Sequence, residues 1–239
     1  MYFAFVLKIG HNTDPLLKTD MTKIEIEAEL KQICPSLRLG IIQCKVNTKE
    51  ECPDLWHIIN ENTRDIQENL AIAGIKDIPS IDSSKKGYRA IGKDPSRYRL
   101  SAESLLRRIV NGKGLYKINN VVDLLNLVSI KSGFSIGGYN ADKIEGLVQF
   151  GIGNTDEPYQ GIGRGKLNIE RLPIFRDNLG AFGSPTSDSL RTQIDETCNN
   201  FLMIIISFQE EEALPEAIKL AIDLLKTHAY AEEIQSIII

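Results

Sequence analysis

The segment FLMIIISF, at Phe201–Phe208, places the strongest constraint on what this chain can fold into. It contains a single polar residue and shows no alternation of apolar and polar side chains. Such a run is typical of a central β-strand that is buried on both faces. The rest of the chain is therefore expected to cover both sides of this strand.

Helical and strand patterns precede this segment. The predicted elements are a strand over Leu37–Val46 and helices over Pro53–Ala73, Ser101–Val110 and about Val121 to Ser132. Ser101 is the expected N-cap of its helix, and Gly133 ends the last one. The polar segment KDIPSIDSSKKG (residues 76–87) is expected to be a connector rich in turn-forming residues.

Short apolar segments separated by turn-forming residues follow from Lys143 onward. Strands are predicted in IEGLVQFGIG, LPIFRD, GAFGSP and Phe201–Phe208, and a final helix over Pro215–His228. The terminal IQSIII is expected to dock against the fold, because it would promote aggregation if exposed. This order of elements indicates an α+β fold, with a mixed sheet packed against helices.

The length of 239 residues is sufficient for one sizeable core. We expect a single domain over residues 21–239, with an N-terminal α/β part to about residue 84 and a core over residues 85–239. A second methionine at Met21 indicates that residues 1–20 are an N-terminal extension.

Composition argues against several classes of protein. Hydrophobic residues make up 42% and charged residues 25% of the chain, as in soluble globular proteins. No apolar run reaches the roughly 18 residues of a membrane span, and the start lacks a signal-peptide pattern. A cytoplasmic protein without a membrane partner is expected. The four cysteines lack CxxC spacing and are expected to be reduced thiols, so neither a metal nor a cofactor is expected.

The charge of the chain is unevenly distributed. The net charge is −4, yet Lys85–Lys117 contains ten Lys and Arg residues against two acidic residues. Such a segment indicates a surface that faces a polyanion, or else a solvated basic face without a partner. The polyanion interpretation selects seven residues: Lys85, Lys86, Arg89, Arg97, Tyr98, Arg99 and Lys113. Their mixture of cations and aromatic rings suits phosphates and unpaired bases.

Two polar residues interrupt the apolar helix that is predicted from about Val121. Asp123 and Asn126 lie three residues apart and therefore share one face of that helix. One alternative is that each forms hydrogen bonds with nearby backbone and stabilises an expected turn at Gly137-Gly138. The other is that at least one of them lines a pocket. The structural role suits Asp123 better, and Asn126 is open to both.

A second polar cluster lies in GSPTSDSLRT, at Gly183–Thr192. Its short side chains can organise a loop of backbone amides that binds an anion or a carbonyl oxygen, or it is an exposed loop. No histidine has an evident link to its serines, so a covalent serine mechanism is not expected. The glycine-rich Gly161–Gly165 lacks a following helix, so a tight β-turn is expected there rather than a nucleotide site.

These segments together resemble a known family. The helix NNVVDLLNLV, the following GGYNADKIEG and the later SDSLRTQIDETCNNFLMIII resemble the B3/B4 domain of the phenylalanyl-tRNA synthetase beta subunit. The likeness covers about Arg97–Phe208 and extends to the chain from Met21 onward. It is greatest to free-standing members, which lack the catalytic and anticodon-binding parts. The resemblance implies a B3/B4-like editing architecture and hydrolysis of wrongly charged tRNA.

The resemblance assigns individual positions. Asn126 falls where the editing site has an Asn, and Leu125 replaces the neighbouring Thr. Gly137 and Ile204 take the positions of the His and Glu that read the tyrosine hydroxyl. Neither can bond to a hydroxyl through its side chain, so a smaller or more apolar amino acid is expected as substrate.

The leading hypothesis is a trans-acting aminoacyl-tRNA deacylase that uses a positioned water. Asn126 would orient the substrate and Asp188 would hold its α-amino group, while backbone amides at Gly137-Gly138 or in Gly183–Thr192 would stabilise the oxyanion. The expected substrate-binding residues are Leu125, Ser187, Arg191, Thr192 and Ile204, and the expected partner is the acceptor end of tRNA. Two alternatives remain: an RNA-binding module without catalysis, and a hydrolase or binder of a small amino-acid derivative.

Overall fold

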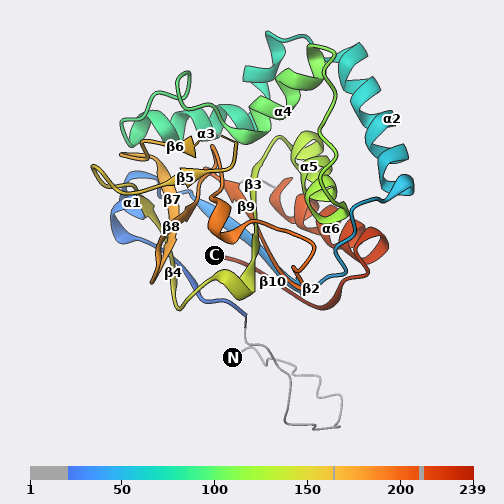
Figure 1. Ribbon diagram of the computed structural model, residues 1–239. Coiled ribbons are helices and arrows are strands. Elements are labelled where there is room, and N and C mark those ends of the chain that lie inside the picture. Colours follow the sequence, from blue (N-terminus) through green and yellow to red (C-terminus); the bar gives the residue numbers. More distant parts are fainter. Residues whose placement is uncertain (1–20, 164, 210–212) are drawn as a thin grey trace, which may run out of the picture.

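The computed structural model describes residues 21–163, 165–209 and 213–239 (Figure 1). The predicted extension at residues 1–20, with His11, lies outside the described residues, as does Arg164 of the glycine-rich segment. The α-helices in the described part are α1 (Ala28–Ile33), α2 (Pro53–Asn69), α3 (Pro79–Ala90), α4 (Ser101–Val110), α5 (Asn120–Ser132) and α6 (Ala213–His228). Short 3-10 helices are η1 (Gly74–Asp77), η2 (Ala141–Lys143) and η3 (Leu190–Thr192).

The strands form two four-stranded sheets and one small hairpin. The first sheet has the order β10 (Glu232–Ile238), β2 (Arg38–Lys45), β9 (Asn200–Ser207) and β3 (Ser135–Asn140), and all of its pairs are antiparallel. The second has the order β1 (Ile24–Ile26), β4 (Val148–Ile152), β7 (Pro173–Asp177) and β8 (Gly180–Gly183). The hairpin consists of β5 (Gln160–Gly161) and β6 (Gly165–Lys166). Because β1 and β4 are parallel, the second sheet is mixed, and the fold is α+β.

The two faces of the first sheet pack against different partners. On one face α6 packs against β2 and β9, and α5 packs against both α6 and β3 (Figure 1). On the other face, Tyr139 of β3 meets Phe175 of β7 and Phe182 of β8, with ring centroids 6.1 and 4.9 Å apart. Strand β9 is therefore buried on both faces, and the prediction for Phe201–Phe208 is confirmed.

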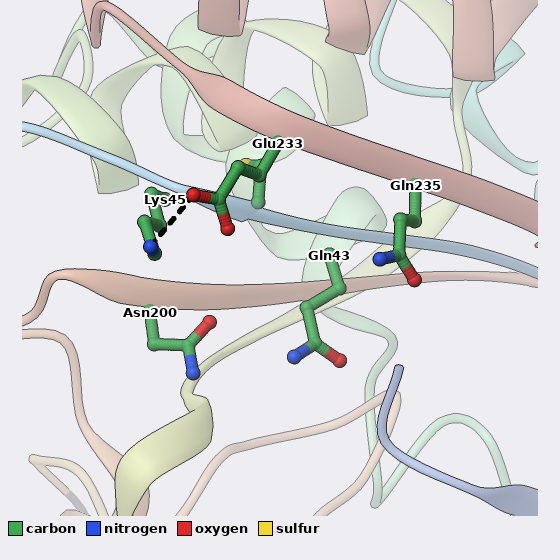
Figure 2. A pocket seen from close by; sticks show the side chains of 6 residues that line it. Gln43, Lys45, Asn200, Glu233 and Gln235 are labelled. Carbon is green, nitrogen blue, oxygen red and sulfur yellow. Dashed lines mark hydrogen bonds and ion pairs between the residues drawn. The ribbon is translucent and has the colours of Figure 1, made fainter. Parts of the chain in front are cut away.

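The strand β2 lies between β10 and β9, so the N-terminal part of the chain contributes an inner strand to the same sheet. The C-terminal β10 completes that sheet at its edge. Figure 2 shows this edge, where Lys45 Nζ lies 2.7 Å from Glu233 Oε1 and Gln235 is the register partner of Gln43. The terminal segment therefore docks as a strand, as the sequence predicts.

Several predicted helices have the expected bounds. The helix α4 spans Ser101–Val110, and α5 ends at Gly133, whose φ of 73° is the left-handed conformation that suits glycine. Ser101, however, is not an N-cap: Leu100 holds the cap position and no side chain caps the helix. Instead the Ser101 amide donates to the Pro185 carbonyl at 2.8 Å, which ties the start of α4 to the Gly183–Thr192 segment.

The predicted connector at residues 76–87 is wrong, because most of it forms the helix α3. Pro79 stands in the first turn, where its missing amide costs nothing. The hydroxyls of Ser83 and Ser84 donate to the Ser80 carbonyl, at 3.1 and 2.7 Å. These local bonds satisfy the polar side chains of a helix that packs against β9.

The predicted turn at Gly137-Gly138 is also wrong, because both glycines lie within β3. Gly137 pairs with Ile204 of β9, and Gly138 pairs with Met203. Pairing with the long apolar β9 overrides the turn tendency of two consecutive glycines. The consequence for the site is large, because adjacent residues of a strand point to opposite faces of the sheet.

Candidate functional site

A cavity of about 430 Å³ lies between α4, α5, the edge strand β3 and the Thr186–Ile194 segment. Its wall is largely aliphatic: Leu105, Ile118, Val122, Leu125, Ile136, Ile162 and Ile194. Polar groups reach it from Ser101, Ser104, Asn126, Ser187 and Gln193. Among the described residues that line it, only Arg108 and Asp188 carry charge. A mostly apolar chamber with a few convergent polar groups is the usual form of a small-ligand site.

Asp123 and Asn126 of α5 have different surroundings. Asp123 is buried, and its carboxylate accepts the Trp56 indole N–H at 2.6 Å and the Ile118 amide at 3.1 Å. Asn126 lines the cavity, and its side-chain amide forms no hydrogen bond with the described part of the chain. Asp123 therefore holds α2 and the residues before α5 in place, whereas Asn126 keeps a donor and an acceptor free for a ligand.

Asp123→Ala is expected to lower the free energy of unfolding by about 1–3 kcal/mol, because the part-buried Trp56 indole and Ile118 amide lose their acceptor. Chemical denaturation at neutral pH would measure the loss. Asp82→Ala is the control, since Asp82 pairs on the surface with Lys86 and its removal should change stability by less than about 0.5 kcal/mol. Equal losses in the two variants would contradict the structural role of Asp123.

Asp188 enters the cavity wall from the opposite side. Its carboxylate accepts the Tyr139 hydroxyl at 2.9 Å and the backbone amides of Ser184 and Gly138. Its side chain is partly exposed where it faces the cavity, and protein encloses it on the other sides. This burial raises the pKa of Asp188 to about 7, although the three hydrogen bonds oppose the rise. A carboxyl group near half ionisation at neutral pH therefore faces the ligand space.

Gly137 and Gly183 make room for Tyr139. A Cβ atom at either glycine would lie 2.1 Å from the Tyr139 hydroxyl oxygen, closer than any real contact. The ring therefore lies against two bare backbone positions, and its hydroxyl reaches Asp188 between them. We infer that Tyr139 positions Asp188, and that glycine at 137 serves packing.

The positions predicted to line a site divide between two faces. Leu125, Asn126, Gly138, Ser187 and Asp188 all line the cavity. Gly137 and its register partner Ile204 face the second sheet with Tyr139, on the opposite face from Gly138, and they do not line it.

The last two predicted positions of the Gly183–Thr192 segment also lie away from the cavity. Arg191 is engaged inside the molecule, where its guanidinium bonds both carboxylate oxygens of Asp177 at 2.8 and 3.1 Å. Thr192 is fully buried. A bidentate pair fixes the guanidinium, so Arg191 anchors η3 to the end of β7 and is not available to a ligand in the cavity.

Three tyrosines from different elements fix the loop that carries Asp188. Besides Tyr139, the Tyr159 hydroxyl donates to the Ser187 carbonyl at 2.6 Å, and the Tyr88 hydroxyl lies 2.9 Å from Thr186 Oγ1. The Ser184 hydroxyl oxygen accepts the amides of Thr186 and Ser187 at 3.2 and 3.0 Å. These two amides and that of Gly138 are already bonded, so they are not free to stabilise an oxyanion.

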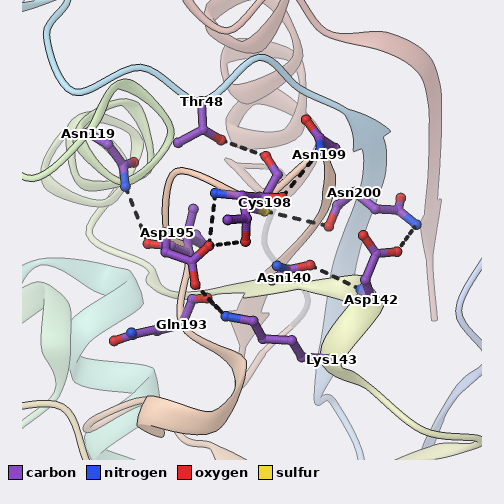
Figure 3. A network of polar contacts seen from close by, with 12 residues as sticks. Thr48, Asn119, Asn140, Asp142, Lys143, Gln193, Asp195, Cys198, Asn199 and Asn200 are labelled. Atoms are coloured by element: carbon purple, nitrogen blue, oxygen red, sulfur yellow. Dashed lines mark hydrogen bonds and ion pairs between the residues drawn. The ribbon is translucent and has the colours of Figure 1, made fainter.

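The segment that carries Gln193 and Ile194 is held separately (Figure 3). Lys143 Nζ lies 2.5 Å from Asp195 Oδ2, and the Asn119 side chain donates to the Ile194 carbonyl at 3.3 Å. The hydrogen bond from Lys143 contributes most to lowering the pKa of Asp195 to about 2. The cavity wall on this side is therefore anchored to η2 and to the start of α5.

The predicted RNA-facing residues are only partly free. Lys85 is 13% exposed, with its Nζ 2.8 Å from Glu103 Oε2, and Tyr98 is half-buried with Lys93 Nζ 3.8 Å from its ring centroid. The exposed members are Lys86, Arg89, Arg97, Arg99 and Lys113. Lys113 follows the C-terminal end of α4 and the others precede its start, so the ten residues of α4, about 15 Å, separate them.

Sequence reasoning missed several participants, among them Ser101, Ser104, Arg108, Tyr116, Gln193 and Tyr139. Alternation in SIGGYN would have placed Gly137 and Tyr139 on one face of a strand. Periodicity in α4 would have placed Ser101, Ser104 and Arg108 along one side. No local pattern shows that Tyr139 reaches Asp188, because 49 residues separate them.

Within the residues that the structure describes, no three His, Cys, Asp or Glu side chains gather in a way that would hold a metal ion. None of the helices in the described ranges is long and apolar enough to cross a bilayer. All four cysteines are free thiols.

A comparison of the sequence with family models identifies the family of this α+β domain. Residues 84–232, more than half of the chain, match the model of the B3/4 domain, and the chain belongs to that family. Among solved structures it is similar to an N-terminal fragment of the phenylalanyl-tRNA synthetase beta-subunit from Pyrococcus horikoshii, at 12% identity and a TM-score of 0.47. That similarity covers 93% of this chain and 56% of the fragment, so the chain spans little more than half of the length of that fragment. No curated protein matches.

Proposed function

We propose that this chain is an aminoacyl-tRNA deacylase that acts in trans on the ester of a mischarged tRNA. One observation carries the proposal: Asn126 and Asp188, from two segments that resemble the editing domain, line the same apolar cavity. Asn126 offers unpaired amide groups and Asp188 offers a carboxylate. These are the groups needed to hold an aminoacyl ester by its carbonyl and its ammonium.

In this mechanism Asp188 pairs with the α-ammonium group of the aminoacyl ester, and the Asn126 amide donates to the ester carbonyl oxygen. A water molecule adds to the carbonyl carbon and gives a tetrahedral intermediate. The ester C–O bond then breaks, the terminal ribose oxygen takes a proton, and free amino acid and tRNA leave. Asn126 replaces the backbone amides of the initial hypothesis as oxyanion donor, since the nearby amides are already bonded.

The cavity wall favours an aliphatic amino acid. Gly137 and Ile204, which stand at the positions of the family's His and Glu, face away from the cavity. Their lack of polar side chains therefore says little about which amino acid the cavity accepts. The lining itself is more informative, because Leu125, Val122 and Ile194 present only hydrocarbon to the ligand space. This part of the wall can hold a branched aliphatic side chain, whereas a hydroxyl placed against these three side chains would lose its hydrogen bonds to water.

A deacylation screen over mischarged tRNAs would test this function. Asn126→Ala and Asp188→Ala are each expected to lower the hydrolysis rate by about 10- to 100-fold. This factor corresponds to the loss of one hydrogen bond to a charged group, or to a group that becomes charged in the transition state. Thr227→Ala on the exposed side of α6 is the control that should leave the rate unchanged, because its hydroxyl bonds only to the Asp223 carbonyl of the same helix and it does not line the cavity. Wild-type rates in both alanine variants on every tRNA would refute the assigned roles. Salt-sensitive tRNA binding without turnover would instead favour an RNA-binding module.

A further inference from the structure

We propose that the mouth of the cavity holds a single unstacked nucleoside at the end of an RNA strand, with Tyr116 as the stacking platform and Arg108 and Lys117 as its cationic partners. The inference rests on the proposed function, which brings an RNA end to this cavity. It adds a binding position that is separate from the predicted basic residues before α4.

The Tyr116 ring is exposed, yet contacts with Arg108 hold it in place. Its side chain is 62% exposed, although it borders the cavity. The Arg108 guanidinium carbon lies 3.6 Å from the ring centroid, and Arg108 Nη1 donates to the Tyr116 hydroxyl at 2.9 Å. One ring face is thus covered by a cation, and the exposure leaves surface on which a base can stack.

The same guanidinium fixes the segment that carries the ring. Arg108 Nη2 donates to the Lys113 carbonyl at 3.2 Å, across residues 111–115, where Gly112 and Gly114 adopt φ of 74° and 57°. Arg108 therefore shapes the segment after α4 so that Tyr116 stands beside the cavity. The ring is positioned before any ligand arrives, which lowers the entropic cost of stacking.

Two more cations lie close to this ring along the chain. Lys113 and Lys117 are exposed on either side of it in sequence, and Lys117 Nζ lies 5.1 Å from the Trp56 ring centroid. The neighbouring Ile118 is 50% exposed and also lines the cavity. An aromatic ring with flanking cations and an apolar neighbour suits a base and its phosphate, whereas a protein partner would require a wider apolar patch.

Binding of a fluorescent RNA tests the inference without any catalysis. The probe is a single-stranded RNA of ten nucleotides that carries no amino acid and ends in an unpaired 3′ adenosine, compared with the same strand ending in an abasic ribose. Tyr116→Ala is expected to raise the Kd of the intact probe about 5- to 100-fold and to abolish its preference over the abasic probe. Tyr116→Phe keeps the ring and should stay within about 3-fold of the wild type.

Two further variants sharpen the test. Lys117→Gln should weaken both probes and reduce the slope of log Kd against log salt by about 0.7, the share of one phosphate on a single strand. Tyr230→Ala is the matched control, because Tyr230 is 61% exposed beneath Lys49, 4.4 Å from the ring centroid, but does not line the cavity. It should leave both Kd values unchanged.

The outcomes separate the two proposals. Deacylation with an unchanged Kd and KM for Tyr116→Ala would overturn the stacking position and leave the deacylase standing. Tyr116-dependent binding without hydrolysis of any aminoacyl-tRNA would support the stacking position and refute the deacylase. Equal binding of the intact and abasic probes by the wild type would also overturn the stacking position.

Discussion

Gly137→Ala is expected to destabilise the fold by about 1–3 kcal/mol, although alanine adds only a methyl group. The new Cβ would lie 2.1 Å from the Tyr139 hydroxyl oxygen and 2.6 Å from its ring carbon Cζ, between two sheets that cannot move apart freely. Displacement of the ring would also remove the hydrogen bond to Asp188. Denaturant titration would measure the loss of stability.

Gly74→Ala is the matched control for this substitution. Gly74 has no positive φ, and its added Cβ would meet only Leu70, at 3.5 Å, an ordinary contact. Its stability should change by less than about 1 kcal/mol. In a Tyr139→Leu background, Gly137→Ala should cost much less than in the wild type, since the clashing hydroxyl is absent. Full additivity of the two substitutions would show that Tyr139 is not the reason for glycine at 137.

Deacylation is expected to fall as the pH is lowered through about 7, because only the ionised form of Asp188 pairs with the α-ammonium group. Rates measured from pH 5.5 to 8, after subtraction of uncatalysed hydrolysis, should lose about tenfold per pH unit below this pKa. Asp188→Asn should remove this acidic limb together with most of the activity. A wild-type profile that stays flat down to pH 5.5 would rule out the ionised carboxylate as the working form.

The same carboxyl group is expected to make stability depend on pH in a defined direction. Its pKa is raised from 3.8 to about 7 on folding, so the folded state holds the proton more tightly than the unfolded chain. The contribution to stability is therefore full below pH 4 and is lost as the pH rises to 7, by at most about 4 kcal/mol. The Asp188→Asn variant has no carboxyl group to titrate at this position. The wild type should therefore lose stability relative to the variant as the pH rises from 4 to 8. No such relative loss would argue against the raised pKa.

Local periodicity determined much of the fold. Start and stop residues predicted the bounds of α4 and the end of α5 at Gly133, and an unbroken apolar run predicted the burial of β9 on both faces. These features depend on neighbours within a few residues and on which faces are apolar, and both are visible in sequence. The same reasoning failed at α3, where serines that look like turn formers bond back to the helix.

The candidate site was predictable in part. Asn126 and Asp188 were both named from sequence. Asp123 and Asn126 share one helical face, and the division between a structural Asp123 and a cavity-lining Asn126 depends on the contacts of Asp123 with Trp56 and Ile118. Arg191 shows the limit, because the composition of its loop could not reveal a bidentate pair with Asp177.

The sequence by itself determined the family, the main elements and the polar residues of α5. Only the tertiary structure decided that Gly138 faces the cavity while Gly137 faces the second sheet, and that Tyr139 reaches Asp188 through the space of two glycines. The physical reason is the two-residue period of a strand: a shift of one position reverses the face. That position was set by pairing of β3 with β9, more than sixty residues away, and not by any property of SIGGYN alone.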